Sequence, residues 1–231
     1  MSELVPSDGG PLAFVDDIDR PELSDDDHHH LARVRRLRDG DPLIVGDGRG
    51  GWRRARLAGR NVEPVGDIVL APAPTPQVGV AFALVKGAKP ELVVQKLTEL
   101  GVDLICPFVA ARSVVRWDAS KARAAHERLE RVAREAAMQS RQAWLPHVEP
   151  VSDHAAVAAR PGACRADRGG GPLRLASPLV LVGPEGGWDE AERAVRLPTA
   201  SLADGVLRAE TAAIVAGALL VALRSGIVAP T

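Results

Sequence analysis

The sequence contains no tyrosine, and aromatic residues make up only 3% of its 231 residues. Its two cysteines, Cys106 and Cys164, lie far apart without CxxC spacing, so neither a zinc site nor a disulfide framework is indicated. No apolar run reaches the roughly 18 residues that span a bilayer, and the longest, Ala212–Leu223, is rich in alanine. Met1–Pro11 lacks both Lys or Arg and an apolar core, so a secretory signal is not expected. These absences favour a globular protein of the reducing cytoplasm.

An excess of charge of one sign is also missing, because the formal net charge is −1. Bulk electrostatics therefore do not predict a nucleic-acid-binding protein. The charges are unevenly distributed, however, with nine Arg and three Asp between residues 33 and 60. Residues 112–141 carry eight Lys or Arg against four Asp or Glu. Such segments can form a basic face on a neutral protein, although solvated surface charge explains either one as well.

Proline divides the chain into two predicted domains, residues 1–72 and residues 73–231. Ala71–Pro76 alternates proline with small residues and is typical of a stiff, extended linker. Before it, two apolar runs flank the glycine-rich turn Gly46–Gly51, which predicts a hairpin. The runs that predict strands are Leu43–Val45, Trp52–Leu57 and Asn61–Leu70. We expect residues 12–71 to form a small β-barrel with one short helix near His29–Arg38.

After the linker, buried apolar runs alternate with amphipathic segments, which predicts an α/β layer sandwich. The expected strands are Val78–Leu84, Leu104–Phe108 and Leu179–Val182. The expected helices are Pro90–Leu100, Ser120–Arg141, a short one opened by the capping-box pattern Asp189-x-x-Glu192, and Glu210–Arg224. Arg160–Ser177 is rich in Gly, Pro and Arg and is expected to be a mobile loop, with Arg160–Gly171 as an insertion.

The glycine-rich loop Gly183–Gly187 follows a predicted buried strand, at the edge where α/β sheets bind ligands. Its glycines allow close approach of backbone to a ligand, but a plain tight turn is an equally good explanation of the loop alone. It has neither the Lys of a P-loop nor the GxGxxG of a dinucleotide site. Trp188 beside it could stack on a base, although core packing is the simpler expectation.

A second candidate segment, Leu202–Ala212, leads irregularly into the last helix. Capping accounts for Glu210 and Thr211 in the first turn. It does not account for Arg208, because a cation next to a helix N-terminus opposes the helix dipole. An ion pair with Glu210 or Glu185 is the alternative to a functional role for Arg208.

Gly183–Gly187 and Leu207–Ala212 together resemble the signature of the bacterial 16S ribosomal RNA uridine N3-methyltransferases, the RsmE family. Further segments are similar to this family in the expected order. They are His29–Arg36 with Asp47–Gly50, Lys86-Gly87, Gln95–Val102, Arg112–Val115 and Glu135–Arg141. The resemblance covers the chain from about His29 to Leu223. Pro11–Phe14 departs from it, because the family usually has an Arg shortly before an aromatic residue at this place.

The resemblance implies a PUA-like RNA-binding barrel followed by a SPOUT methyltransferase domain with a deep C-terminal trefoil knot. It implies S-adenosyl-L-methionine as cofactor, held mainly by backbone atoms of the two segments, and a homodimer. The substrate implied is the uridine at position 1498 of 16S ribosomal RNA, presented within the small ribosomal subunit. No metal is expected, because a sulfonium carries its own leaving group and His28–His30 has no second ligand cluster at metal spacing.

The residues expected to act follow from these segments. Arg208 is the first candidate for stabilising a deprotonated uracil, and Glu210 is a candidate base. The expected cofactor contacts are Leu181, Val182, Gly183, Pro184, Glu185, Gly186, Gly187, Leu202, Gly205, Val206, Leu207, Arg208, Thr211 and Ala212. The expected RNA contacts are Arg33, Arg36, Arg49, Lys86, Arg112 and Arg141, where solvated surface charge is the alternative.

Two other functions remain open from the sequence. One is a non-catalytic RNA-binding or ribosome-assembly protein on the same fold. The other is an α/β enzyme that acts on a small molecule with a different nucleotide. Binding of S-adenosylmethionine separates methyl transfer from both alternatives.

Overall fold

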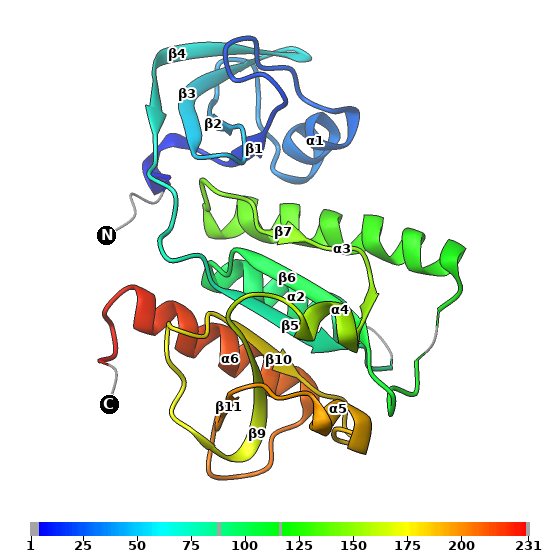
Figure 1. The fold of residues 1–231 in the computed structure, drawn as a ribbon. Coiled ribbons are helices and arrows are strands. Elements are labelled where there is room, and N and C mark those ends of the chain that lie inside the picture. Colours follow the sequence, from blue (N-terminus) through cyan, green and yellow to red (C-terminus); the bar gives the residue numbers. More distant parts are fainter. Residues whose placement is uncertain (1–4, 87–88, 116, 230–231) are drawn as a thin grey trace. The chain divides into compact units, whose positions relative to one another are not determined.

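A computed structural model describes residues 5–86, 89–115 and 117–229 (Figure 1). The chain divides into two compact units. The first comprises Met1–Pro74 and Arg134–Leu145, and the second comprises Thr75–Ala133 and Pro146–Thr231. Helix α3 (Ala119–Ser140) contributes residues to both, which the sequence did not indicate.

The first unit is built on a four-stranded sheet in the order β1-β2-β3-β4. Its strands are β1 (Leu12–Phe14), β2 (Pro42–Gly46), β3 (Gly51–Ala58) and β4 (Asn61–Leu70). β1 runs parallel to β2, whereas β2–β3 and β3–β4 are antiparallel, so the predicted hairpin across the glycine-rich turn is confirmed. The predicted small β-domain is therefore present as one sheet in linear order, with no ladder between β1 and β4 among the residues described here.

The helical segment of the first unit begins earlier than predicted. After the short 3-10 helix Ser7–Gly9, α1 spans Asp25–His29 and continues as a π-helical turn over His30–Val34. Ser24 caps α1 by accepting a hydrogen bond from the amide of Asp27, and three aspartates in the first turn suit the helix dipole. The predicted range His29–Arg38 was therefore wrong at both ends, and Arg36 adopts a left-handed φ of 59° that no helix continues.

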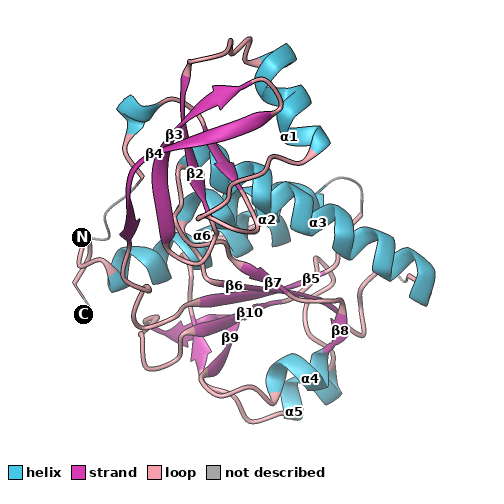
Figure 2. Cartoon of the chain, turned by 90° about the horizontal axis from the view of Figure 1, so that it is seen from above, coloured by secondary structure: helices cyan, strands magenta, loops and turns pink. Residues whose placement is uncertain are grey.

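The second unit contains a parallel sheet in the order β11-β9-β10-β5-β6-β7, with β8 also paired to β6 (Figure 2). Every ladder in it is parallel. Its strands are β5 (Gly79–Ala83), β6 (Leu104–Val109), β7 (His147–Val148), β8 (Ser152–Asp153), β9 (Ala163–Gly171), β10 (Leu179–Val182) and β11 (Thr199–Ala200). The order reverses between β5 and β10, which is the switch point where such sheets bind ligands.

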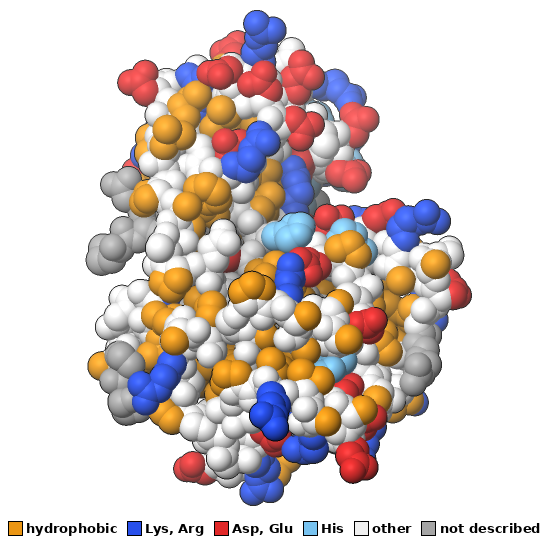
Figure 3. Space-filling model, viewed as in Figure 1, with side chains coloured by type: hydrophobic (Ala, Val, Ile, Leu, Met, Phe, Trp, Pro, Cys, Tyr) orange, Lys and Arg blue, Asp and Glu red, His pale blue; other side chains and the backbone are white. Residues whose placement is uncertain are grey.

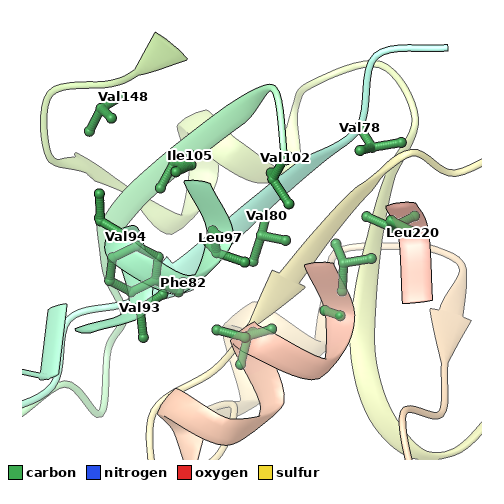
Figure 4. Close-up of a cluster of buried hydrophobic side chains, with 14 of the residues drawn as sticks. Val78, Val80, Phe82, Val93, Val94, Leu97, Val102, Ile105, Val148 and Leu220 are labelled. Atoms are coloured by element: carbon green, nitrogen blue, oxygen red, sulfur yellow. The ribbon is translucent and has the colours of Figure 1, made fainter. Parts of the chain in front are cut away.

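Helices cover both faces of this sheet. Side chains of α2 (Lys89–Leu100), the first half of α3 and α6 (Ala209–Arg224) pack on one face, around a core that includes Val80, Phe82 and Leu220 (Figure 4). The other face carries α4 (His154–Ala158), and α5 (Glu190–Ala194) lies on the same side (Figure 2). In α6, a Cβ at Gly217 would lie 2.5 Å from Leu97, so this glycine lets α6 pack closely on α2.

Most of the predicted elements of the second unit are confirmed within one or two residues, including the capping box that Asp189 and Glu192 form at α5. Arg160–Ser177 was wrongly predicted to be a mobile loop. Ala163–Gly171 is strand β9, because Ala163 and Cys164 are buried and pair with β10. No helix within the described ranges is long and apolar enough to cross a membrane.

Candidate functional site

Loops from three neighbouring strands meet at the carboxyl edge of the parallel sheet. Lys86 follows β5, Arg112 follows β6, and the glycine loop Gly183–Gly187 follows β10. Because β10, β5 and β6 are adjacent and parallel, their carboxyl ends lie side by side. The first predicted ligand segment therefore occupies the switch point of the sheet.

The glycine loop is a tight turn set against a rigid base. The amide of Gly187 donates to the carbonyl of Pro184 at 2.8 Å, and Gly187 has a left-handed φ of 69°. A Cβ at Gly183 would lie 3.0 Å from the ring of Trp188. Trp188 itself is buried, stacks on Phe108 and donates its indole N–H to a backbone carbonyl, so the expectation of core packing is confirmed.

Arg112 supports the glycine loop from the neighbouring strand end. Its guanidinium donates to the carbonyl of Gly186 at 3.0 Å, and a Cβ at Gly186 would lie 3.3 Å from the Cβ of Arg112. The sequence indicated a phosphate contact for Arg112. The hydrogen bond places Arg112 against the glycine loop, and its exposed side chain leaves the phosphate contact a prediction.

The second segment is open on its outer side. Gly205 has no atoms within 4 Å of the position of a Cβ, and the side chain of Val206 is 78% exposed. Arg208 is the N-cap residue of α6, makes no side-chain cap, and is exposed. Among the described residues it forms no ion pair, so the suggested pairing with Glu210 or Glu185 is not observed.

Lys89, which the sequence did not single out, joins the two segments. Its ammonium lies 3.4 Å from a carboxylate oxygen of Glu185 in the glycine loop and 3.1 Å from one of Glu210 at the start of α6. The two segments, which are separated by β11 in the chain, therefore meet at one cation. The one local signal that could have identified this lysine is its positive charge at the start of a helix, and its two carboxylate partners lie far away in the sequence.

The charges at this junction set the protonation state of Glu210. Its side chain is 13% exposed. Desolvation favours the neutral acid, but a hydrogen bond from the backbone amide of Glu210 and the ammonium of Lys89 outweigh it, so the pKa of Glu210 lies below its usual value. The carboxylate of Glu210, followed by that of Glu185, raises the pKa of Lys89. Both shifts favour the charged forms of Glu210 and Lys89 at neutral pH.

The predicted cofactor residues differ in what they can offer a ligand. Leu181 and Val182 are buried strand residues, so only their backbone groups are available. Pro184 is buried as well. The remaining predicted residues are exposed or partly exposed around the junction: Gly183, Glu185, Gly186, Gly187, Leu202, Gly205, Val206, Leu207, Arg208, Thr211 and Ala212. An open backbone rim with few free side chains suits a ligand that is held by amides and carbonyls.

The predicted RNA contacts fall into separate groups. Arg33, Arg36 and Arg49 are exposed in the first unit, and Lys86 is exposed in the second. Gly87, which belongs to the same family-like pair as Lys86, lies outside the described residues. These four cations remain available for contacts with phosphate.

Two arginines of the first unit have structural partners instead. Arg141 donates to the carbonyls of Pro6 and Gly10, both at 2.7 Å. Arg134 lies over the ring of Phe14, 5.8 Å from its centroid, and donates to its backbone carbonyl. Because both guanidinium ends of Arg141 are already hydrogen-bonded, this residue is better explained as an anchor of the N-terminal segment than as a phosphate contact.

The two thiols are not suited to nucleophilic chemistry. Burial, together with the carboxylate of Glu149, raises the pKa of Cys106 to about 12. Burial raises the pKa of Cys164 to about 11. Reactive cysteines have lowered pKa values and access to a substrate, and neither residue meets these conditions. No cluster of three or more His, Cys, Asp or Glu that could hold a metal occurs in the described part of the chain.

Comparison with known proteins identifies both units. Residues 71–221 match the RNA methyltransferase domain family, and residues 23–61 match the RNA methyltransferase PUA domain family. The Ribosomal RNA small subunit methyltransferase E of Mycobacterium bovis is 32% identical over an alignment 244 positions long. The alignment covers 90% of this chain and 86% of that protein.

Solved structures share the fold over almost the whole chain. A probable rRNA-methyltransferase from Porphyromonas gingivalis is 29% identical with a TM-score of 0.78, covering 94% of this chain and 100% of that one. The Ribosomal RNA small subunit methyltransferase E of Neisseria gonorrhoeae, solved bound to S-adenosyl methionine, is 24% identical with a TM-score of 0.77, covering 93% and 98%. The expected combination of a small PUA-like β-domain with a SPOUT α/β domain is confirmed, and the β-domain is built on a four-stranded sheet. The chain belongs to the RsmE family of RNA methyltransferases.

Proposed function

We propose that this protein transfers a methyl group from S-adenosylmethionine to N3 of a uridine in 16S ribosomal RNA. The observation that carries the proposal is the junction at Lys89, which brings the glycine loop and the start of α6 together at the switch point of the sheet. The cofactor bound in the Neisseria relative and the name of the Mycobacterium relative support it. Position 1498 of that RNA rests on the family resemblance.

The residues at the junction fit such a cofactor. Backbone groups of Leu181–Gly187 and Leu202–Leu207 are available for an adenosine and its amino-acid tail, and Oε2 of Glu210 is shielded from solvent without a partner among the described residues. A buried acceptor of this kind is usually satisfied by a donor, such as a ligand N–H or O–H. When bound, S-adenosylmethionine supplies a methyl group that is already activated by the sulfonium charge.

The chain must then present a uracil with its N3 proton removed. The exposed guanidinium of Arg208, at the rim of the junction and without an ion-pair partner among the described residues, can stabilise the negative charge that develops on the imide. Glu210 is poorly suited to remove the proton, because its lowered pKa makes its carboxylate a weak base. We therefore assign Arg208 to the substrate and Glu210 to holding the site.

The unreactive thiols favour a heteroatom as the methyl acceptor. Methylation of a uracil carbon requires a nucleophile that first adds to the ring, and a thiolate is the usual choice. The high pKa values of Cys106 and Cys164 do not provide one. Nitrogen N3 needs only orientation and loss of its proton, which a water molecule at the exposed rim of the site can accept.

The first unit offers a place for the RNA backbone. A pocket of about 440 Å³ is lined by Asp25, His28, His29, Ala32, Arg33 and Arg60. Arg33 and Arg60 can bind a phosphate there, although Arg60 is at present ion-paired with Asp25. Acidic and basic side chains are intermixed over the face of this unit that Figure 3 shows. We propose that phosphate is bound locally, at this pocket.

Family membership supports three further parts of the proposal. Residues 1–72 would act as the RNA-binding PUA domain, and residues 73–231 would act as the methyltransferase domain with a C-terminal trefoil knot. The protein would work as a homodimer on the small ribosomal subunit. Its place of action would be the cytoplasm, where that subunit is assembled.

Methyl transfer to isolated small subunits tests the proposal. Subunits from a strain that lacks the protein are incubated with the enzyme and methyl-labelled cofactor, and the RNA is digested to locate the label. We expect labelled N3-methyluridine with the wild type, and a loss of about 100-fold or more in rate for Arg208→Ala, because one charge-stabilising donor is removed. Cofactor binding without label in the RNA would favour the non-catalytic RNA-binding alternative, and absence of cofactor binding would remove the proposal.

A further inference from the structure

Lys89 occupies a position that helix stability does not explain. It is the first residue of α2, where the helix dipole disfavours a cation. It also lies on neither of the two ligand segments, because α2 follows β5. Its ammonium nevertheless contacts one carboxylate from each segment, at 3.4 Å for Glu185 and 3.1 Å for Glu210. These two carboxylates offset the unfavourable interaction between the ammonium and the dipole of α2. Because neither carboxylate belongs to α2, contacts outside that helix explain the position of Lys89.

We infer that Lys89 is a positioning residue that clamps the glycine loop to the start of α6 and so holds the cofactor cradle closed. The inference rests on the proposed function for the identity of the ligand. The clamp itself is a property of the unliganded chain. It links three segments that are distant in sequence, β5–α2, β10–α5 and β11–α6, through a single side chain.

An ordinary surface ion pair is the alternative, and such pairs contribute little to stability. The same helix offers a comparison in Lys96, which pairs with Glu99 at 2.8 Å within one turn of α2. That pair joins no separate segments. Lys89 differs because Glu210 is largely shielded and its second carboxylate oxygen has no partner among the described residues.

Removing the ammonium would leave two carboxylates, Glu185 and Glu210, facing the same space without their shared cation. A shielded carboxylate that loses its partner is unfavourable, and like charges repel. Arg208 is the other cation near Glu210, but it is exposed and does not replace the contact. The glycine loop and the start of α6 should then separate, so that a ligand spanning both must first reorder them.

Calorimetry with S-adenosylmethionine on the full chain measures this effect. We expect Lys89→Met to raise the dissociation constant about 10-fold, because a charge-assisted contact that orders the site is lost. Lys89→Arg keeps the charge and should stay within about 3-fold of the wild type, which corresponds to less than half of that loss on a logarithmic scale. Lys96→Met, the same chemical change on the same helix, should bind as the wild type does.

A double variant separates the clamp from a general loss of structure. Glu185→Gln removes one arm of the same link. In the unliganded protein, Lys89→Met/Glu185→Gln should therefore exchange amide hydrogens no faster over residues 202–210 than Lys89→Met alone. Fully additive increases in exchange would overturn the inference. Equal binding by Lys89→Met and the wild type would overturn it as well.

Amide hydrogen exchange of the unliganded protein tests the clamp without any cofactor. Lys89→Met should exchange faster than Lys96→Met in both peptides that cover residues 183–187 and 202–210, with unchanged exchange in β2 and β3. Unchanged exchange in those two peptides would exclude the clamp even if the wild type binds the cofactor. If the exchange changes as expected and the wild type fails to bind S-adenosylmethionine, the proposed function fails and the clamp stands.

Discussion

Replacing Trp188 by Phe tests whether this residue, next to the glycine loop, belongs to the core or to the ligand site. Its indole N–H donates to the carbonyl of Ala166 at 3.0 Å, the residue is 4% exposed, and its ring stacks on that of Phe108. The variant loses this hydrogen bond and part of the ring volume, which together should lower the free energy of unfolding by about 2–4 kcal/mol.

Trp52 provides a matched control in the first unit. It is similarly buried at 9%, but its indole nitrogen has no hydrogen-bond partner among the described residues. Trp52→Phe therefore loses ring volume without losing a hydrogen bond, and we expect a cost below about 1.5 kcal/mol. Urea unfolding followed by circular dichroism measures both variants.

The two interpretations of Trp188 differ in how stability and binding respond. If Trp188 is a core residue, Trp188→Phe is less stable and binds S-adenosylmethionine with an affinity close to that of the wild type at a temperature where it is folded. A variant as stable as the wild type whose ligand affinity falls more than about 10-fold, or 1.4 kcal/mol, would refute the core assignment.

Two further predictions concern the same site. Gly187→Ala should lower the free energy of unfolding by about 1–2 kcal/mol, because a left-handed φ of 69° is unfavourable for a residue with a Cβ, even though the space around it is open. A thermal melt with an unchanged midpoint would contradict this prediction. Glu210 has a lowered pKa in the folded protein, so its ionised form stabilises the fold above the unfolded pKa of about 4.3, and this contribution is lost as the pH falls through the folded value. The difference in free energy of unfolding between the wild type and Glu210→Gln should therefore be largest near neutral pH and decrease in acid. Urea unfolding at a series of pH values measures this difference, and an increase in acid would contradict the prediction.

Patterns of burial in the sequence predict the parallel sheet and its helices well. β10 is continuous in apolar residues because both faces of the strand are covered, and the apolar stripe of α2 faces the sheet. The capping box at Asp189 is a local signal that tertiary contacts did not alter. Such elements are specified by neighbours in the chain.

The predictions from sequence were wrong for segments whose structure depends on capping residues or on contacts with distant parts of the chain. The glycines and arginines of β9 have low strand propensity, yet pairing with β10 and β11 makes this segment a strand. The start of α1 is set by the N-cap Ser24 and the aspartates that follow, so the helix begins at Asp25 and not near His29 as predicted. In both segments, the local residue types predicted a different structure from the one that tertiary pairing or helix capping produces.

In the candidate site as well, local features could be predicted from the sequence, whereas contacts between distant segments could not. The glycine loop and Arg208 could be identified from the sequence, because a strand–glycine junction and a cation at a helix start are local anomalies. Lys89 is likewise a cation at the start of a helix, but its two carboxylate partners lie on segments far along the chain, so only the structure shows what it contacts. Arg112 and Arg141 were predicted to contact RNA phosphate, but only the structure shows which backbone carbonyls they bind.

Hydrogen exchange with and without S-adenosylmethionine tests the shared cradle most directly. We predict that the cofactor slows amide exchange in both peptides that contain Gly186 and Val206, and leaves the first-unit strands β2 and β3 unchanged. Protection of one of the two peptides alone, or of neither at saturating cofactor, would contradict a site built from both segments.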